Sequence, residues 1–276
     1  MASSFPEPRT ALVTGAGQRI GRAIALGLGA DGWAVAVHHR DSQGSAVGSA
    51  AGSAADAEET VAMIESAGGR AVALAAELSD EAAASDLAGR AAAALGPLGC
   101  LVNNASLFEY DNVESATQAT WEAHMAVNLR APFLLSQAFA AALPTARPTA
   151  ISSGTNGAII NILDQRVWNL TPHFISYTLS KSGLWTLTQT LALALAPRIR
   201  VNAIGPGPVL PSARQTAAQF RTQCENTPLG RGTEPEEIAA AVRFILAAPA
   251  MTGQMMALDG GQHLGWSMPP GNEVEE

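Results

Sequence analysis

Short apolar runs of strand length alternate with longer segments of helical periodicity, and this alternation restricts the fold more than any other feature. It predicts an α/β fold in which a doubly wound parallel sheet of about seven strands carries helices on both faces. The predicted strands are Ala11 to Val13, Trp33 to Val37, Arg70 to Ala75, Leu98 to Val102, Ala158 to Leu163, Ile199 to Ile204 and Gln254 to Leu258. The predicted helices are Arg19 to Ala30, Ala55 to Ala67, Asp80 to Leu95, Thr117 to Leu143, Ser176 to Ala196 and Glu236 to Ala247.

The predicted elements continue in phase past two candidate loops, the low-complexity stretch Ser42 to Ala57 and the connection Pro144 to Gly157. A chain of 276 residues that is 47% hydrophobic can bury a large core, so we expect a single domain over residues 1–276. The proline-rich segment from about 205 to 231 is the candidate substrate loop, because long loops in compact domains often cover a site.

Charge and cysteine content exclude several classes of function. The net charge of −8 argues against a nucleic-acid-binding protein, which is expected to present a basic face. Cys100 and Cys224 lack companions at metal-ligand spacing, so we expect neither a disulfide framework nor a metal site. With no export signal and no apolar stretch of membrane-spanning length, the expected location is the cytoplasm.

Three glycines, Gly15, Gly17 and Gly21, lie between the first predicted strand and the first predicted helix. Backbone amides in such a turn can approach a pyrophosphate, and the N-terminus of the helix favours its negative charge. We therefore predict dinucleotide binding here. The alternative, in which the glycines serve only the turn, stays open on the glycines alone.

The end of the second predicted strand bears on the choice between NAD and NADP. Proteins that bind NAD place an acid there for the ribose hydroxyls, whereas this chain has His39 followed by Arg40. An arginine suits a 2′-phosphate through charge-assisted bonds, and Arg19 in the glycine loop can reach the same group. NADP(H) is the predicted cofactor, although Arg40 can also be a solvated loop charge partly offset by Asp41.

Tyr177 and Lys181 are four residues apart in a predicted helix, so their side chains share a face. An ammonium in that place can stabilise a phenolate and lower the pKa of a tyrosine from its reference value of about 10. Tyr177 is therefore a candidate proton donor. Taken singly, Tyr177 can also cap a core and Lys181 can be a solvated charge.

With Thr14-Gly15-Ala16-Gly17-Gln18-Arg19-Ile20-Gly21 and Asn103-Asn104-Ala105-Ser106, the pair resembles the short-chain dehydrogenase/reductase family along nearly the whole chain. The resemblance implies a Rossmann-type fold and an oxidoreductase in which Tyr177 protonates the substrate and Lys181 holds the nicotinamide ribose. It also implies that Asn128 supports a proton-relay water. The cofactor contacts that it implies are Gly15, Gly17, Arg19, Ile20, Gly21, His39, Arg40, Glu77, Leu78, Asn103, Ala105, Ser106, Tyr177, Lys181 and Gly207.

Asp164 lies thirteen residues before the tyrosine, where most relatives carry a serine that donates a hydrogen bond to a substrate oxyanion. An ionised carboxylate has no proton to donate and would repel that charge. It suits a C=N bond that gains a proton on nitrogen. In a different interpretation Asp164 caps the following turn, and the substrate is a ketone held by Tyr177.

The Asp-x12-Tyr-x3-Lys arrangement, and Phe108 shortly after the Asn-Asn-Ala-Ser segment, resemble the pteridine reductases. That resemblance implies a pterin stacked between the nicotinamide and Phe108. Its substrate contacts would be Arg19, Ser106, Phe108, Asp164, Tyr177 and Gly207. Phe108 can also be an ordinary apolar anchor of its loop.

The first hypothesis is therefore an NADPH-dependent reductase of a dihydropterin or dihydrofolate. The second is a carbonyl reductase or alcohol dehydrogenase of the same fold, acting on a 3-oxoacyl, sugar or small ketone substrate. The third is a non-catalytic NADP-binding sensor, which would not require Tyr177, Lys181 and Asn128. The family resemblance further implies a homotetramer, with Trp266 near a subunit contact.

Overall fold

The computed structural model describes residues 8–40, 52–143 and 157–265, which contain one parallel sheet of seven strands in the order β3-β2-β1-β4-β5-β6-β7. Its strands are β1 (Thr10–Val13), β2 (Ala34–Arg40), β3 (Arg70–Ala76), β4 (Cys100–Asn103), β5 (Gly157–Ile162), β6 (Ile199–Pro206) and β7 (Met255–Leu258). The strand order reverses direction between β1 and β4. Ligands bind outside the carboxyl ends of the strands at such a switch point.

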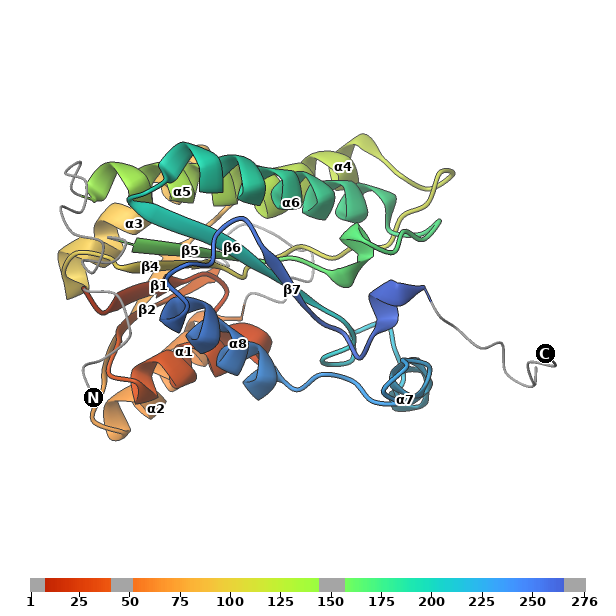
Figure 1. The fold of residues 1–276 in the computed structure, drawn as a ribbon, viewed down its shortest axis with the longest axis horizontal. Coiled ribbons are helices and arrows are strands. Elements are labelled where there is room, and N and C mark those ends of the chain that lie inside the picture. Colours follow the sequence, from red (N-terminus) through yellow and green to blue (C-terminus); the bar gives the residue numbers. More distant parts are fainter. Residues whose placement is uncertain (1–7, 41–51, 144–156, 266–276) are drawn as a thin grey trace.

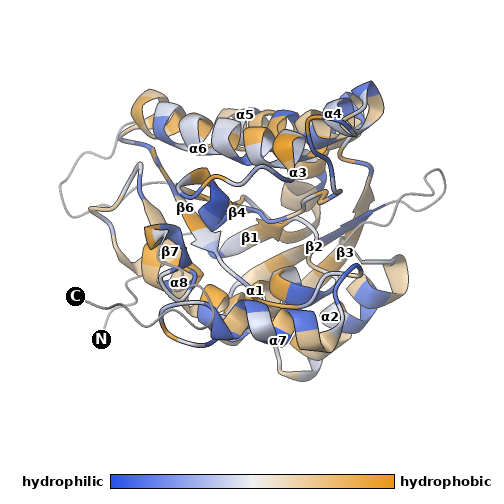
Figure 2. Cartoon of the chain, turned by 90° about the vertical axis from the view of Figure 1, so that its right-hand side faces the viewer, coloured by the Kyte–Doolittle hydropathy of each residue, from blue (hydrophilic) through white to orange (hydrophobic). Residues whose placement is uncertain are grey.

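Helices cover both faces of the sheet, which confirms the predicted doubly wound α/β fold (Figure 1). One layer consists of α1 (Arg19–Ala30), α2 (Ala54–Ser66) and α8 (Pro235–Ala247), and the other of α3 (Glu81–Leu95), α4 (Gln118–Met125), α5 (Ala131–Ala142) and α6 (Ile175–Leu195). Figure 2 shows the two layers on either side of the strands. Among the described helices, none combines the length and the apolar character needed to cross a bilayer.

Strand β1 shows how the sequence pattern builds the two halves of the core. Ala11 and Val13 pack in one apolar cluster with α1 and α8, whereas Leu12 belongs to a second cluster with α3 and α5. All three side chains are fully buried. Successive side chains of a strand point to opposite faces, so a central parallel strand needs an unbroken apolar run rather than an alternating one.

The segment predicted as one helix from Thr117 to Leu143 is interrupted. Helix α4 ends at Met125, a π-helical turn spans Ala126–Arg130, and α5 begins at Ala131. A π turn keeps the apolar pattern nearly continuous while it inserts one residue, so the sequence periodicity did not reveal it. The turn contains Asn128, one of the predicted site residues.

Several elements begin or end at residues other than those predicted. Strand β2 continues three residues beyond Val37, and the segment predicted as a substrate loop contains the end of β6 and a short helix, α7 (Ala217–Glu225). Helix α2 begins at Ala54, inside the predicted Ser42 to Ala57 loop, because Ser53 and Asp56 form a capping box at its start. Residues 42–51 of that loop, residues 144–156 of the second loop, Asp41 and Trp266 lie outside the described residues.

Candidate active site

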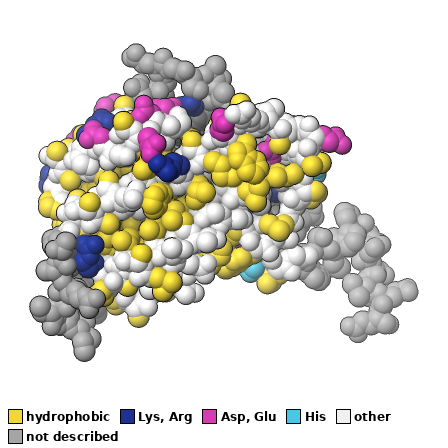
Figure 3. Space-filling model, turned by 90° about the horizontal axis from the view of Figure 1, so that it is seen from above, with side chains coloured by type: hydrophobic (Ala, Val, Ile, Leu, Met, Phe, Trp, Pro, Cys, Tyr) yellow, Lys and Arg dark blue, Asp and Glu magenta, His cyan; other side chains and the backbone are white. Residues whose placement is uncertain are grey.

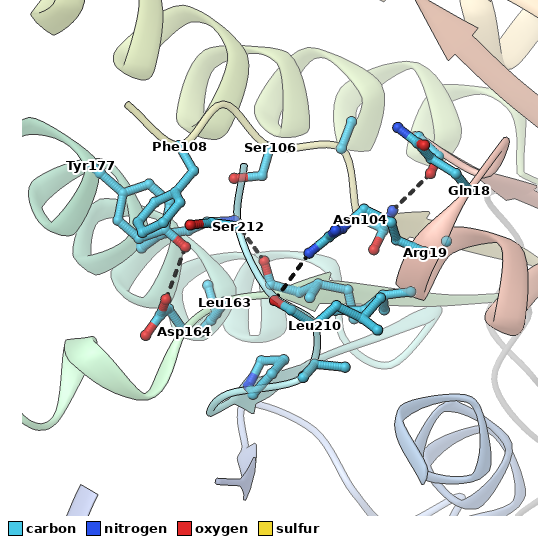
Figure 4. Close-up of a pocket in the computed structure, with 18 of the residues that line it drawn as sticks. Gln18, Arg19, Asn104, Ser106, Phe108, Leu163, Asp164, Tyr177, Leu210 and Ser212 are labelled. Carbon is cyan, nitrogen blue, oxygen red and sulfur yellow. Dashed lines mark hydrogen bonds between the residues drawn. The ribbon is translucent and has the colours of Figure 1, made fainter. Parts of the chain in front are cut away.

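A pocket of about 470 Å³ lies outside the carboxyl ends of the central strands, at the switch point of the sheet. It brings together many predicted site residues that are far apart in sequence. Those lining it are Gly15, Arg19, Ile20, Gly21, Ala105, Ser106, Phe108, Asp164, Tyr177, Lys181 and Gly207. Figure 4 shows Tyr177, Phe108 and Asp164 gathered at one end of the pocket and Arg19 at the other.

Tyr177 and Asp164 are in direct contact. The Tyr177 hydroxyl donates to Asp164 Oδ2 at 3.0 Å (Figure 4). Asp164 Oδ1 accepts the Arg166 backbone N–H at 2.8 Å. Asp164 comes directly after β5 and Leu163, and Tyr177 lies in the first turn of α6, so strand and helix bring the two groups together. The carboxylate therefore caps the following 3-10 turn with one oxygen and faces the pocket with the other. Capping of the turn is therefore compatible with a place for Asp164 in the pocket.

Lys181 is buried and its ammonium donates to the Ile162 carbonyl at 2.8 Å. Its Nζ lies 5.8 Å from the centre of the Tyr177 ring. Burial lowers the pKa of Lys181 to about 8. One helical turn thus places the lysine beside the tyrosine, at the base of the pocket.

The electrostatics of Tyr177 differ from the sequence expectation. Its pKa is raised well above 10, first by burial and then by the negative charge of Asp164. Lys181 does not supply the expected lowering of this pKa, since the lysine donates to a backbone carbonyl, whereas the carboxylate is hydrogen-bonded to the phenol itself. Tyr177 is held as a protonated donor at neutral pH.

Asn128 joins the helical layer to the segment after β4. Its Nδ2 donates to the Leu107 carbonyl at 2.9 Å and to Ser180 Oγ at 3.0 Å, and its Oδ1 accepts the Leu107 N–H at 2.8 Å. Ser106 Oγ also donates to this oxygen, at 3.3 Å. The amide therefore fixes the backbone that carries Ser106 and Phe108.

An aromatic cluster closes the substrate end. Phe108 stacks on Phe174 with ring centres 4.5 Å apart, and it meets the edge of Tyr177 at 4.6 Å. The Arg214 guanidinium lies 5.3 Å from the centre of the Phe108 ring, donates to the Phe108 carbonyl and pairs with Glu109 at 2.9 Å. Phe108 is a packed anchor of its loop and also a wall of the pocket, so both sequence interpretations describe it.

The glycine loop fits a dinucleotide phosphate. Helix α1 begins at Arg19 with no side chain capping its N-terminus, so backbone amides of its first turn remain for an anion. A Cβ on Gly15 would lie 3.1 Å from Ala105 Cα, and one on Gly21 would overlap the Gly15 carbonyl oxygen at 2.1 Å. Gly21 therefore serves the close packing of helix against turn, and Gly17, outside the pocket lining, lies against α2.

Arg40 and Glu77 form an ion pair, with Arg40 Nε 2.7 Å from Glu77 Oε2. The Arg40 charge is therefore tied to β3 rather than merely solvated. His39 is buried beside it, and its Nδ1 is 3.0 Å from the Arg40 carbonyl. These residues and Leu78 lie at the ends of β2 and β3, outside the pocket lining.

Two further residues have mainly structural contacts in this arrangement. Asn103 is buried and donates to Asn161 Oδ1 at 2.8 Å, which joins β4 to β5. Gly207 lies where a Cβ would be 2.7 Å from Asp259 Cα, so the turn after β6 has no room for a side chain.

Sequence reasoning missed His38. It is buried under the glycine loop, where its Nδ1 accepts the Gly15 N–H at 3.0 Å and its Nε2 lies 3.2 Å from the Ala76 carbonyl. Burial lowers its pKa to about 4, so the ring is neutral. The available signal was a histidine directly after the apolar run of a central strand.

The substrate segment contributes residues that the motifs did not indicate. Leu210 and Pro211 accept hydrogen bonds from the Arg19 guanidinium at 3.2 and 3.1 Å, so Arg19 reaches across the pocket to this segment. Arg214 comes from the same segment. In the described part of the chain, no group of three or more His, Cys, Asp and Glu side chains is arranged to hold a metal.

Known proteins that are similar to this chain identify its family. The family model described as short chain dehydrogenase matches residues 9–222. The structure is similar to that of FolM Alternative dihydrofolate reductase 1 from Brucella suis in complex with NADP, at 44% identity and a TM-score of 0.84 over 95% of this chain and 98% of that one. It is also similar to the Brucella canis protein of the same name complexed with NADP, at 41% identity and a TM-score of 0.85 over 98% and 100%.

A curated relative has a different substrate in its name. Galactitol 2-dehydrogenase (L-tagatose-forming) of Cereibacter sphaeroides is 34% identical over 261 residues, which is 91% of this chain and 93% of the relative. The family model covers more than half of the chain, and each of these relatives covers more than nine tenths of it. The chain therefore belongs to the short chain dehydrogenase family.

Proposed function

We propose that this protein is an NADPH-dependent reductase that transfers hydride to the C=N bond of a dihydropterin or dihydrofolate. The observation that carries the proposal is the hydrogen bond of 3.0 Å between Tyr177 and Asp164, beside the ring of Phe108 in one pocket. A carboxylate in this position suits an acceptor that gains a proton on nitrogen and opposes an oxyanion. The similarity to two dihydrofolate reductases crystallised with NADP supports the assignment.

The residues on the substrate side have distinct roles in this proposal. Tyr177 is kept protonated by burial and by Asp164, so it can deliver a proton toward the pocket. Asp164 Oδ2, which accepts the Tyr177 O–H, orients the hydroxyl, and its negative charge stabilises the positive charge that develops on the substrate nitrogen. Phe108 offers a ring face for a flat bicyclic substrate, and Ser106 supplies a hydroxyl on the same wall.

The residues on the cofactor side form a second group. The amides at the start of α1 would hold the pyrophosphate, Lys181 the nicotinamide ribose, and Arg40 with Arg19 the 2′-phosphate. The bound reduced nicotinamide would supply the hydride. The Lys181 ammonium is held in place for this role by its bond to the Ile162 carbonyl.

The direct test measures NADPH oxidation with dihydrobiopterin, dihydromonapterin and dihydrofolate, each against a panel of activated ketones and a reaction without substrate. We expect the enzyme to turn over at least one dihydropterin, with a kcat/KM well above that for every ketone. Efficient ketone reduction with no dihydropterin turnover would assign the chain to the carbonyl reductases. Tight NADPH binding with neither activity would assign it to the sensors.

The carbonyl-reductase hypothesis remains the second candidate because of the galactitol dehydrogenase relative. In that case Tyr177 alone would hold a substrate oxygen, with Asp164 engaged in capping through Arg166 N–H. The ring of Phe108 in the pocket wall, held by stacking on Phe174, favours the flat pterin over a sugar.

We also propose a homotetramer of single-domain subunits that works in the cytoplasm. Helix α6 leaves apolar side chains on its outer side, with Leu193 84% and Leu179 45% exposed. Figure 3 shows apolar side chains spread over the face seen from above, where α5 and α6 lie in Figure 1, and such a face suits subunit contact.

The unbroken seven-stranded sheet supports one domain, and the free thiols of Cys100 and Cys224 suit a reducing compartment.

A further inference from the structure

Three polar side chains form a fully buried network beside Tyr177 that the proposed chemistry does not use. Ser176 Oγ donates to Asp111 Oδ2, and His124 Nδ1 lies 2.6 Å from the same Ser176 oxygen. His124 Nε2 is 3.1 Å from the backbone nitrogen of Glu109. Asp111, His124 and Ser176 each have 0% exposure.

The hydrogen bonds fix the protonation of His124. The Ser176 hydroxyl has one proton and donates it to Asp111, so its oxygen accepts from His124 and Nδ1 must carry hydrogen. Nε2 must then be bare, because it accepts the Glu109 N–H. Burial lowers the pKa of His124, which favours this neutral ring.

The network connects the two parts of the substrate end. On one side, Glu109 follows Phe108, whose ring forms a pocket wall. On the other, Ser176 precedes Tyr177 at the start of α6.

Asp111 supplies the cap that the N-terminus of α6 otherwise lacks. Phe174 stands at the N-cap position in a left-handed conformation (φ 58°) without a capping side chain. Asp111 accepts the Ser176 N–H through both carboxylate oxygens, at 3.2 and 3.3 Å, and its own carbonyl accepts the Phe174 N–H at 2.7 Å. A residue 65 positions away therefore holds the beginning of the helix that carries Tyr177.

We propose that His124 is a positioning residue that fixes Phe108 relative to Tyr177 and so sets the position of the aromatic wall of the pocket. Its Nδ1 is tied to α6 through Ser176, and its Nε2 holds the peptide that follows Phe108. The Phe108 and Tyr177 rings accordingly meet edge to face, with centres 4.6 Å apart and an interplanar angle of 69°. This inference rests on the proposed function, because the pocket is assigned to a flat dihydropterin.

Two variants separate the two ends of the imidazole. The side-chain oxygen of a glutamine can take the place of Nε2, so His124→Gln keeps an acceptor for the Glu109 N–H. The amide nitrogen of an asparagine can take the place of Nδ1, so His124→Asn keeps the donor to Ser176 and leaves the Glu109 N–H without its partner. His173→Asn is the matched control, because His173 is an exposed histidine that contacts Tyr110.

We expect His124→Asn to raise the dihydropterin KM about ten-fold, as loss of one buried hydrogen bond does. NADPH affinity should stay within about two-fold of the wild type. In His124→Gln the dihydropterin KM should lie close to the wild-type value, because the acceptor for the Glu109 N–H is kept. A purely structural role would lower the melting temperature of both variants and leave the KM of the folded protein unchanged. Equal KM values in the wild type, His124→Asn and His124→Gln would overturn the proposal.

Hydrogen exchange of the Glu109 amide gives a readout that needs no substrate. Protection should be lost in His124→Asn and kept in His124→Gln and in His173→Asn. Exchange that is unchanged in His124→Asn would overturn the positioning role even if dihydropterins are substrates. A wild-type protein that ignores every dihydropterin would overturn the proposed function, while the exchange pattern would still decide whether His124 holds this segment.

Discussion

The Tyr177 hydroxyl donates to Asp164 Oδ2 across 3.0 Å, and the same carboxylate receives the Arg166 N–H on its other oxygen. The second bond fixes the direction in which Oδ2 points. A proton donor and a carboxylate are thereby placed as one unit against the pocket. This relationship determines which substitutions discriminate between a C=N substrate and a ketone.

Replacement of Asp164 tests the substrate class. In Asp164→Ser, pterin reduction should fall sharply, because a serine offers only a neutral hydrogen bond where a carboxylate assisted protonation of nitrogen. Any weak activity on activated ketones should persist or rise, since the hydroxyl donates to an oxyanion. Steady-state kinetics on both substrate classes give the result, and unchanged pterin turnover would refute the role of Asp164.

Removal of the Tyr177 hydroxyl tests proton delivery. Tyr177→Phe should lower kcat at least ~100-fold with little change in NADPH affinity, because the donor is lost while the ring volume stays. Turnover and cofactor titration by fluorescence measure the two quantities separately. Near-normal turnover would exclude Tyr177 from the chemistry.

The Phe108 ring is expected to contribute stacking. Phe108→Ala should raise the dihydropterin KM by loss of roughly 1 kcal/mol or more of stacking and burial. Phe108→Leu is the control, since it keeps apolar bulk without an aromatic face. A pterin KM that is the same in all three proteins would make Phe108 only a packing anchor of its loop.

Cofactor preference should depend on Arg40. Arg40→Asp removes a partner of the 2′-phosphate and adds repulsion, so NADPH should weaken far more than NADH. It also breaks the pair with Glu77, and NADH kinetics in the same variant report any damage from that loss. Equal kcat/KM for NADH and NADPH in the unmodified enzyme would contradict the assignment.

Acid stability should depend on His38. Burial lowers its pKa from 6.5 to about 4, so between these values the unfolded chain binds a proton that the folded chain does not. Stability is then lost as the pH falls through this window. The total loss, reached below both pKa values, is on the order of 3 kcal/mol. Urea unfolding at pH 7 and pH 4.5 should show a smaller difference in His38→Asn than in the wild type. If the free energy of unfolding falls by the same amount in both proteins, His38 does not contribute to the loss of stability in acid.

Local motifs could identify the residues that act through their own spacing. Gly15, Tyr177 and Lys181 occur in short patterns whose geometry is set by one turn or one helix, and the structure places all three in the pocket. The strands were predictable because buried parallel strands require continuous apolar runs.

Residues that act through tertiary contacts were not predictable. His38, His124 and Arg214 meet their partners across 23, 52 and 105 positions, and no local pattern records such a contact. The raised pKa of Tyr177 has the same origin, since it arises from burial and from a carboxylate on another element.

The π-helical turn at Ala126–Arg130 makes the position of Asn128 depend on the length of the chain as well as on its sequence. A π turn accommodates one residue beyond the α-helical repeat, and each residue of an α-helix advances by about 100°. Deletion of one residue here would convert the wide turn into ordinary α-helix and redirect the side chains within it, while α4 and α5 keep their relative directions. The Asn128 amide would then leave the Leu107 backbone that it holds on both sides. In this part of the chain, insertions and deletions are therefore constrained more tightly than substitutions.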